Sequence, residues 1–387
     1  MFRKIIVSAI KVAGWITLGI VALLLLVIAL VQVPAIQRKL VSTAVTFVEK
    51  KIGTPVSLGA IHIALPKKIV LHDLYLQDES RDTLLWANEI GVDTDLFALL
   101  DHEVMLNRVT LSGIRAGIGT SDSGRFNFQY IIDAFADTTI VADTTKQAWA
   151  ISLGEIVIED TKLRYHDLAG GNTLDLYTGN LRVSIDTFDL ENKRISIDEL
   201  QIENINTSFI QTTLPLQNST PADNTNNTTP YDIDVRTVNL KKISAHYEQQ
   251  ALRQMLRLDL GQLELRANKI DVINRNIDLE KLSLDDTFVY FQHAQSSTTP
   301  DTATTQASTD NLWRINLQAL SLDNNSFQYH NFSKPFAQDG IDFNHLWIRD
   351  FALAAKQIAF AGNSFGADIN NISFQEKSGF GLRAVYG

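Results

Sequence analysis

The stretch Trp149-Ala-Ile-Ser-Leu-Gly-Glu-Ile-Val-Ile158 carries the pattern that decides the fold. It recurs without a gap as Trp313-Arg-Ile-Asn-Leu-Gln-Ala-Leu-Ser-Leu322, 164 residues later. A third copy, Tyr231-Asp-Ile-Asp-Val-Arg-Thr-Val-Asn-Leu240, lies midway, 82 residues from each of the others. A long repeat at a fixed period is typical of an extended array whose units stack on their neighbours. We therefore expect a repeat array.

Within each unit, apolar residues alternate with polar ones, which predicts strands with one apolar face and one polar face. A sheet of this kind must cover its apolar face. After residue 102 the sequence shows no convincing amphipathic helix, so the cover is a second sheet, the same sheet curled over, or a ligand with a long apolar body. We predict an all-β extended repeat array that forms a curled, taco-like sheet with an apolar groove. A sandwich of two sheets packed dry is the alternative.

The apolar positions that recur from unit to unit are the candidate lining of this groove. They are Ile151, Leu153, Leu181, Val183, Ile233, Val235, Leu263, Leu265, Ile315 and Leu317. The step from Leu153 to Ile156 breaks the two-residue period. A bulge or a change of strand at this step would move half of the candidates to the other face.

The N-terminus predicts a membrane anchor. Residues 1–11 form a basic tail, and residues 12–33 form an apolar run of 22 residues, about 33 Å long as a helix, which is enough to span a bilayer core. The run is longer than the core of a signal peptide and lacks a convincing cleavage site. We predict a transmembrane signal anchor over 12–33, with the basic tail in the cytoplasm.

Residues 34–53 predict an amphipathic helix that opens at Pro34 and stops at Gly53. Its apolar stripe is expected to cap the first edge of the sheet, and contact with lipid is the alternative. The first β unit then covers 54–135. Its apolar pairs predict separate short strands, for example one at Val104 and Leu106 and the next at Val109 and Leu111. A short helix over 95–102 with Asp95 as its N-cap is also expected.

The remaining units are predicted at 149–211, 231–293 and 313–387, and the last reads as truncated. Each opening is preceded by a polar, apolar-poor stretch, at 136–148, 212–230 and 294–312. We predict that these three stretches are disordered surface loops, because they contain little to bury. Insertions of this kind collect where they do not disturb the stacking of units. Asp-Thr triplets within them are read as solvated linker, with O-glycan attachment as the alternative.

Composition and motifs argue against several classes of function. The net charge of −10 and the pI of about 5.3 disfavour a nucleic-acid partner, which needs a basic surface. The chain has no cysteine and eight scattered histidines, and no metalloprotease, hydrolase, P-loop or dinucleotide-binding motif occurs. His166 and His330 occupy equivalent positions of the repeat, which favours a structural role. We expect no catalytic residue, no metal site, no cofactor and no enzymatic activity.

Several passages together resemble one family. They are the anchor and the helix that ends in Lys50-Lys-Ile-Gly-Thr-Pro-Val-Ser-Leu-Gly59, the passage Ile69-Val-Leu-His-Asp-Leu-Tyr-Leu-Gln-Asp78, the segments Asp82–Leu85, Asp95–Leu100 and Phe126–Phe128, and the β repeat itself, which ends in Phe374-Gln-Glu-Lys-Ser-Gly-Phe380. Over essentially its whole length the chain resembles the AsmA-like superfamily. Within it the chain is similar to the TamB proteins, the inner-membrane subunits of the translocation and assembly module. TamB proteins are usually longer and end in a characteristic domain without counterpart here, so the chain reads as an N-terminal portion.

The resemblance implies a single-pass inner-membrane protein of a Gram-negative bacterium, with a cytoplasmic N-terminus and the bulk of the chain in the periplasm. It also implies phospholipid transport between the inner and outer membranes, or outer-membrane biogenesis with a barrel partner in the outer membrane. The main alternative is a scaffold for outer-membrane proteins that acts by β-strand pairing around a dry core. An adhesin-like surface protein is disfavoured by the uncleaved anchor.

Overall fold

The computed structural model describes residues 33–64, 67–95, 97–98, 102–136, 150–213, 231–271, 275–294, 313–362 and 364–385. The predicted tail and all but the last residue of the predicted transmembrane segment lie outside these ranges. Among the helices that the structure does describe, none is both long and apolar enough to cross a membrane.

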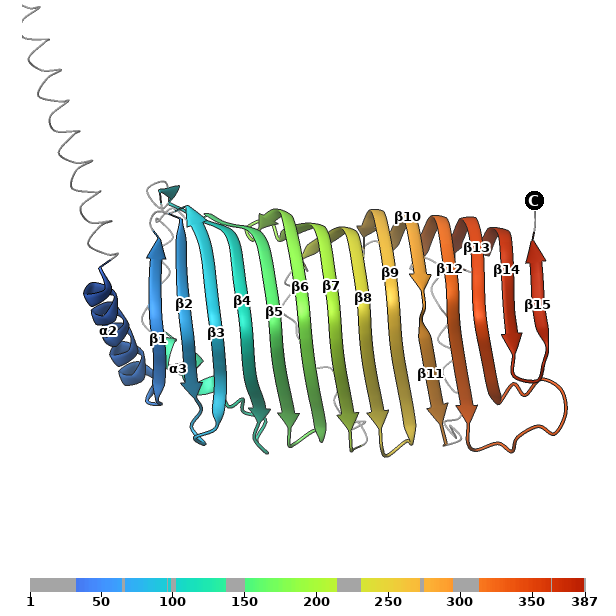
Figure 1. Cartoon of the computed structure of the whole chain (residues 1–387), viewed down its shortest axis with the longest axis horizontal. Coiled ribbons are helices and arrows are strands. Elements are labelled where there is room, and N and C mark those ends of the chain that lie inside the picture. Colours follow the sequence, from blue (N-terminus) through green and yellow to red (C-terminus); the bar gives the residue numbers. More distant parts are fainter. Residues whose placement is uncertain are drawn as a thin grey trace, which may run out of the picture.

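Helix α2 spans Pro34–Ile52 and lies along the first strand (Figure 1). Pro34 suits its first turn because the missing N–H of proline would have no partner there. Gly53 ends the helix with φ of 78° and donates its N–H to the carbonyl of Glu49 at 2.8 Å. This left-handed conformation is one that glycine adopts at no steric cost. The helix therefore begins and ends where local chemistry favours it.

In the described part of the chain, fifteen strands form a single sheet whose order follows the sequence. Strand β11 alone lies off this path, and it pairs with β9 and β12. The strands are β1 (Val56–Ala64), β2 (Lys68–Gln77), β3 (Thr83–Asp95), β4 (Glu103–Thr120), β5 (Ala150–Asp167), β6 (Asn172–Asp189), β7 (Arg194–Gln211), β8 (Asp232–Gln249), β9 (Gln254–Asp271), β10 (Asn276–Asp285), β11 (Phe288–His293), β12 (Arg314–Asn331), β13 (His345–Ala361), β14 (Ser364–Glu376) and β15 (Gly381–Val385). The all-β prediction is confirmed. The alternative of two packed sheets is wrong, because every described strand belongs to this one sheet.

The repeat unit is a set of three antiparallel strands, and consecutive units meet through parallel pairs. β4 pairs in parallel with β5, β7 with β8, and β10 with β12. Parallel neighbours require a connection of a dozen residues or more, because the chain must return to the end where the first strand began. The predicted polar loops fall at these junctions. Their conformation lies outside the described residues except at their ends, such as Thr212, whose N–H bonds to the carbonyl of Gly171.

The first unit carries two short segments beside β3 and β4. Asp95, the expected N-cap of the helix over 95–102, is the last residue of β3, and its carboxylate accepts the N–H of Phe97 at 2.9 Å, as an N-cap residue does. Residues 96 and 99–101 lie outside the described part of the chain. A helix that was not predicted, α3 (Gln129–Phe135), follows β4. Its seven residues are too few to show a helical period in the sequence.

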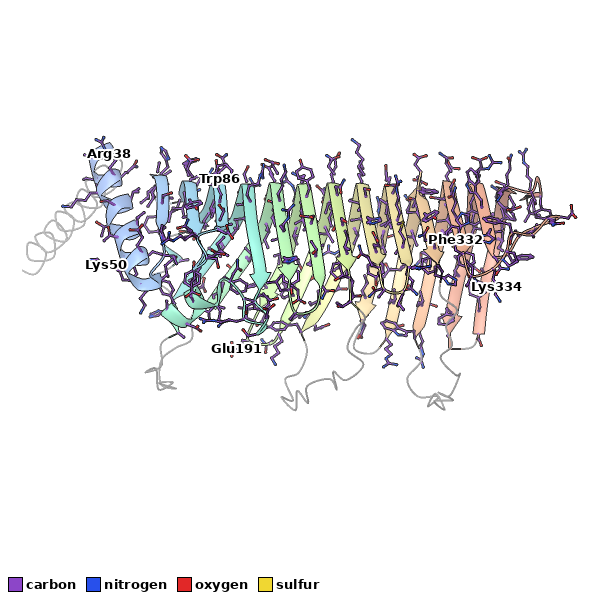
Figure 2. All side chains as sticks on the ribbon, turned by 90° about the horizontal axis from the view of Figure 1, so that it is seen from below. Arg38, Lys50, Trp86, Glu191, Phe332 and Lys334 are labelled. Atoms are coloured by element: carbon purple, nitrogen blue, oxygen red, sulfur yellow. The ribbon has the colours of Figure 1, made fainter. Side chains whose placement is uncertain are left out.

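The sheet is curled about its long axis. In Figure 1 the upper ends of the strands from β5 to β14 bend away from the viewer, and α3 lies behind β1–β3 on the same side. Figure 2 shows the result from below: Trp86 of β3 lies on one side of the fold, and Glu191, in the turn after β6, lies on the other. Helix α3 packs on Leu74, Leu76 and Leu84, so the apolar face is the inner face of the curl.

A line of left-handed residues runs across the sheet, which we call the crease. Its members have φ between 43° and 63° and occupy matching positions on neighbouring strands: Asp73, Gly113, Asp160, Asn204, Lys242, Asp286, Asn324 and Asp350. Most are Asp, Asn or Gly, the residue types that tolerate this conformation best. Each interrupts the alternation of side chains between the two faces by one residue, and the strand stays paired with its neighbours before and after it. The segments predicted as separate short strands at Val104 and Val109 are parts of one strand, β4, which also continues across the crease at Gly113.

Glycines face the crease on strands that lack a left-handed residue. Gly179 of β6 lies opposite Asn204, and a Cβ at Gly179 would stand 2.7 Å from the Cβ of Asn204. Gly261 of β9 lies opposite Asp286, where the corresponding distance is 2.6 Å. Real Cβ atoms do not approach other carbon atoms this closely. Only glycine, which has no Cβ, therefore fits opposite the crease at Gly179 and Gly261.

We predict that Gly179→Ala lowers the free energy of unfolding by about 1–3 kcal/mol, because the new methyl group must displace the backbone of Asn204. Gly366→Ala in β14 is the matched control, since a Cβ there meets nothing within 4 Å. Chemical unfolding followed by circular dichroism measures both variants. Equal stability of the two variants would contradict the steric account.

Candidate functional site

The inner face carries apolar residues in three rows that cross the strands. The first row lies near the start of β5 and comprises Ile151, Leu153, Ile195, Ile197, Ile233, Val235, Ile277, Leu279, Ile315 and Leu317. The second row comprises Ile156, Ile158, Leu181, Val183, Leu200, Ile202, Val238, Leu240, Leu263, Leu265, Leu282, Leu284, Leu320 and Leu322. Within the second row apolar residues face apolar partners on the next strand, for example Ile156 opposite Val183 and Val183 opposite Leu200. Such pairs are the units that stabilise a sheet face.

The third row lies beyond the crease and was not selected from the sequence. It comprises Leu163, Tyr165, Leu174, Leu176, Phe209, Tyr247, Leu256, Leu258, Val289, Phe291, Phe327, Tyr329, Leu346 and Ile348. Because the crease adds one residue, the apolar positions shift from even numbers at Ile156 and Ile158 to odd numbers at Leu163 and Tyr165. The extra residue thus keeps all three rows on one face.

A second irregularity separates the first row from the second. The pairing of β4 with β5 passes from Leu106 opposite Leu153 to Arg108 opposite Glu155 and leaves Asn107 and Gly154 unpaired with each other, whereas the equivalent step between β6 and β7 carries a shift of register at Ile185. This is the step where the sequence departs from the two-residue period. The structure shows the consequence at β9, β10 and β12, where Leu279 and Leu317 of the first row pack with Leu265, Leu282 and Leu320 of the second. The first and second rows therefore lie on the same face at these strands.

The ten candidate residues divide between the first two rows, and most are only partly covered. Ile151 is 42% exposed and Ile233 is 46% exposed, whereas Leu317 is 7% exposed. Ile151 borders an open hollow with Phe188 and Leu190. The other seven candidates are intermediate in burial. Side chains of this kind in a two-layered protein would be fully buried, so the described chain does not supply a second layer over this face.

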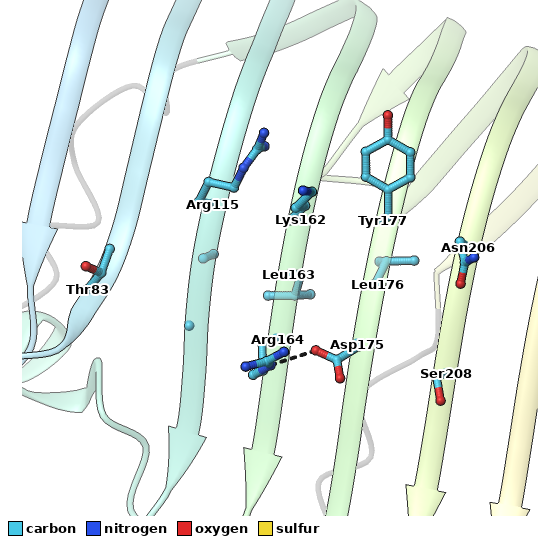
Figure 3. A pocket seen from close by; sticks show the side chains of 12 residues that line it. Thr83, Arg115, Lys162, Leu163, Arg164, Asp175, Leu176, Tyr177, Asn206 and Ser208 are labelled. Carbon is cyan, nitrogen blue, oxygen red and sulfur yellow. Dashed lines mark hydrogen bonds and ion pairs between the residues drawn. The ribbon is translucent and has the colours of Figure 1, made fainter.

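The opposite, outer face of the sheet is polar. Figure 3 shows Arg164 of β5 directed at Asp175 of β6, with 2.7 Å between Nε and Oδ1. Arg115 of β4 reaches Asp160 at 2.9 Å. Ion pairs on an exposed surface contribute little to stability, and their distribution here mainly keeps this face in water. The three rows of apolar side chains thus lie on the inner face.

The first end of the inner face is closed. Val45, Val48 and Ile52 of α2 pack with Val56, Leu84 and Tyr130, the last from α3. The hydroxyl of Tyr130 donates to the carbonyl of Gln77 at 2.8 Å and accepts from Thr54 Oγ1 at 3.2 Å. Helix α2 therefore packs along the first strand, and α3 lies over the inner face of β1–β3.

The two repeat-equivalent histidines have different surroundings. His166 Nδ1 lies 3.0 Å from Thr173 Oγ1 at an exposed strand end. His330 Nδ1 lies 3.3 Å from Nδ1 of the fully buried His345, which stacks on Phe336. Burial, with smaller effects of His345 and Lys377, lowers the pKa of His330 from its ordinary value of 6.5, against the opposing effect of Asp342. Among the described residues no group of side chains is arranged to bind a metal ion.

We predict that acidification through the range below pH 6.5 destabilises the fold at His330. Its folded pKa lies below its unfolded pKa, so the unfolded chain binds more protons there and stability rises with pH. His330→Phe keeps a ring beside Phe332 and removes the titration. Thermal unfolding at several pH values should show a shallower pH dependence for this variant, with His166→Phe as the matched control. An unchanged slope would contradict the assignment.

Comparison with protein families matches residues 8–188 to the model of the AsmA family. The matched range covers the predicted anchor segment, α2 and the sheet as far as β6. This match supports an AsmA-like assignment, which implies a general role in outer-membrane assembly or lipid transport. Comparison with curated proteins finds no match.

Proposed function

We propose that this protein holds and conducts phospholipid along the apolar inner face of its curled sheet, as a non-enzymatic TamB-like carrier between the inner and outer membranes. The observation that carries the proposal is the three-row apolar face, which remains half-exposed across units with no second layer in the described chain. Exposed apolar surface of this extent normally marks a binding site. A ligand with long apolar chains supplies the missing cover.

The dimensions of the sheet suit a path rather than a single pocket. Fourteen strands follow one another along the sheet, and at ~4.8 Å between neighbours they extend for about 60 Å. The three apolar rows run along this direction. Acyl chains lying on the rows would leave a phospholipid headgroup at the open side of the curl, in water. The AsmA-family match supports a lipid-related role.

The rest of the proposal follows from the sequence. Residues 12–33 serve as the anchor in the inner membrane, the sheet lies in the periplasm, and an outer-membrane barrel protein is the expected partner at the far end. The matching alternative is an assembly scaffold with a dry inner face, which recruits client strands by edge pairing. The half-exposure of Ile151 and Ile233 favours the lipid path.

A matched pair of adjacent residues on β9 tests the proposal. Leu263 lies in the second row of the inner face, between Leu240 and Leu284. Gln262 is exposed on the outer face, between Lys241 and Asp285. A charge in an acyl-chain environment costs about 2.5–3.5 kcal/mol, roughly a hundredfold in local affinity. We predict that Leu263→Asp lowers the phospholipid bound per protein and that Gln262→Asp does not.

The full chain and its two variants are released from membranes in detergent. Mass spectrometry then measures how much phospholipid stays bound to each of the three proteins. Circular dichroism verifies that the sheet is retained, and Leu263→Gln provides a milder polar variant. Equal lipid content in Leu263→Asp and Gln262→Asp, with both folded, would favour the dry scaffold.

A further inference from the structure

We propose that the outward side of α2 lies on the surface of an anionic phospholipid bilayer. This proposal about α2 rests on the membrane anchor of the proposed function, but it does not depend on lipid binding within the curled sheet. The side in question carries Leu40 and Phe47, which are spaced seven residues apart and therefore project from the same side of the helix. Val33 directly precedes the first turn of α2 as its N-cap.

Val33, Leu40 and Phe47 lie outside the cluster that packs α2 on the sheet. Phe47 is 61% exposed, and Leu40 and Val33 are each 41% exposed. The side of α2 that meets the sheet is a different one, because Val45, Val48 and Ile52 pack on the first strands. The helix thus presents two apolar stripes, one that caps the sheet and one that has no cover among the described residues. A stripe required only for capping would leave the outward positions polar.

The charge of α2 matches an anionic surface. Arg38, Lys39, Lys50 and Lys51 are all exposed, in a chain whose net charge is −10. The single acidic residue of the helix, Glu49, accepts the N–H of Val56 at 3.1 Å and is therefore engaged toward the sheet. Basic side chains near an apolar stripe are typical of helices that lie in the interface of a membrane, and each adds about 1 kcal/mol of attraction near an anionic leaflet.

The place of α2 in the chain brings this stripe to a bilayer. The apolar run of residues 12–33 ends directly before Pro34, with no polar linker between the run and the helix. Where the run leaves a membrane, α2 is the next element along the chain. This contiguity selects a lipid surface over a protein partner as the cover of the stripe.

The arrangement has a consequence for orientation. In Figure 1, α2 lies at one end of the long axis of the sheet and is roughly aligned with the strands. A helix that lies flat on the bilayer would set the strands along the membrane plane. The long axis of the sheet, and the three apolar rows with it, would then point away from the membrane.

The absence of cysteine from the chain allows a direct test. Single cysteines are introduced as Leu40→Cys and Phe47→Cys on the outward stripe, with Ser42→Cys and Thr46→Cys as exposed controls on the polar side of α2. Each full-length variant is labelled with an environment-sensitive fluorophore. It is then reconstituted in vesicles of phosphatidylcholine with or without phosphatidylglycerol, which carry a nitroxide on some of their lipids.

We expect the labels at 40 and 47 to be quenched several times more strongly than those at 42 and 46, and more strongly still with phosphatidylglycerol. Adding Phe47→Glu should remove most of the quenching at position 40. Equal quenching at all four positions, or none, in a chain that floats with the vesicles would overturn the inference about α2 alone. A chain that fails to float with vesicles would contradict both this inference and the proposed anchor, while the lipid content measured for Leu263→Asp remains an independent result.

Discussion

The fold depends on one constraint: the long sheet has one apolar face, and the described part of the chain provides no second layer to cover it. Hydrogen bonding along the strands is satisfied by the neighbours, so the array extends unit by unit without a globular core. Burial in the described chain is correspondingly sparse, and even Ile151 and Ile233 at the repeat openings remain half in water. Curling brings apolar rows together but does not enclose them. The fold is consistent with a protein whose apolar partner is a ligand.

The curl has an identifiable origin in the backbone. A residue with positive φ recurs at matching positions, such as Asp160, Lys242 and Asn324, and Gly179 and Gly261 make room for it on the strands opposite. A left-handed residue changes the direction of a strand locally. When such residues are aligned across a sheet, with the register unbroken as between β5 and β6 and between β8 and β9, the local bends add up to a continuous change of direction. They also restore the alternation, so that the rows on the two sides of the crease present apolar side chains to the same space.

Much of this architecture could be predicted from the sequence, for physical reasons. The 82-residue repeat and the alternation of residues such as Leu181 and Val183 indicated a stacked β array, because side chains on a strand alternate between faces. The crease was missed because a polar residue such as Asp160 within a strand is also explained by solvation. The repeat held the missing signal, since Asp160, Lys242 and Asn324 are spaced by one period. The third row was missed for the same reason. Which residues beyond the crease face inward depends on the residue that the crease adds.

The central claim is that lipid covers the inner face. It is tested most directly by photo-crosslinking in cells from single positions of the full chain. Val183 and Leu265 face inward in the second row, whereas Ser184 and Gln262 occupy outward positions on the same two strands. The account predicts phospholipid adducts from Val183 and Leu265 and none from Ser184 and Gln262. Absence of phospholipid adducts at both inward positions in a folded protein, or equal adducts at all four, would contradict it.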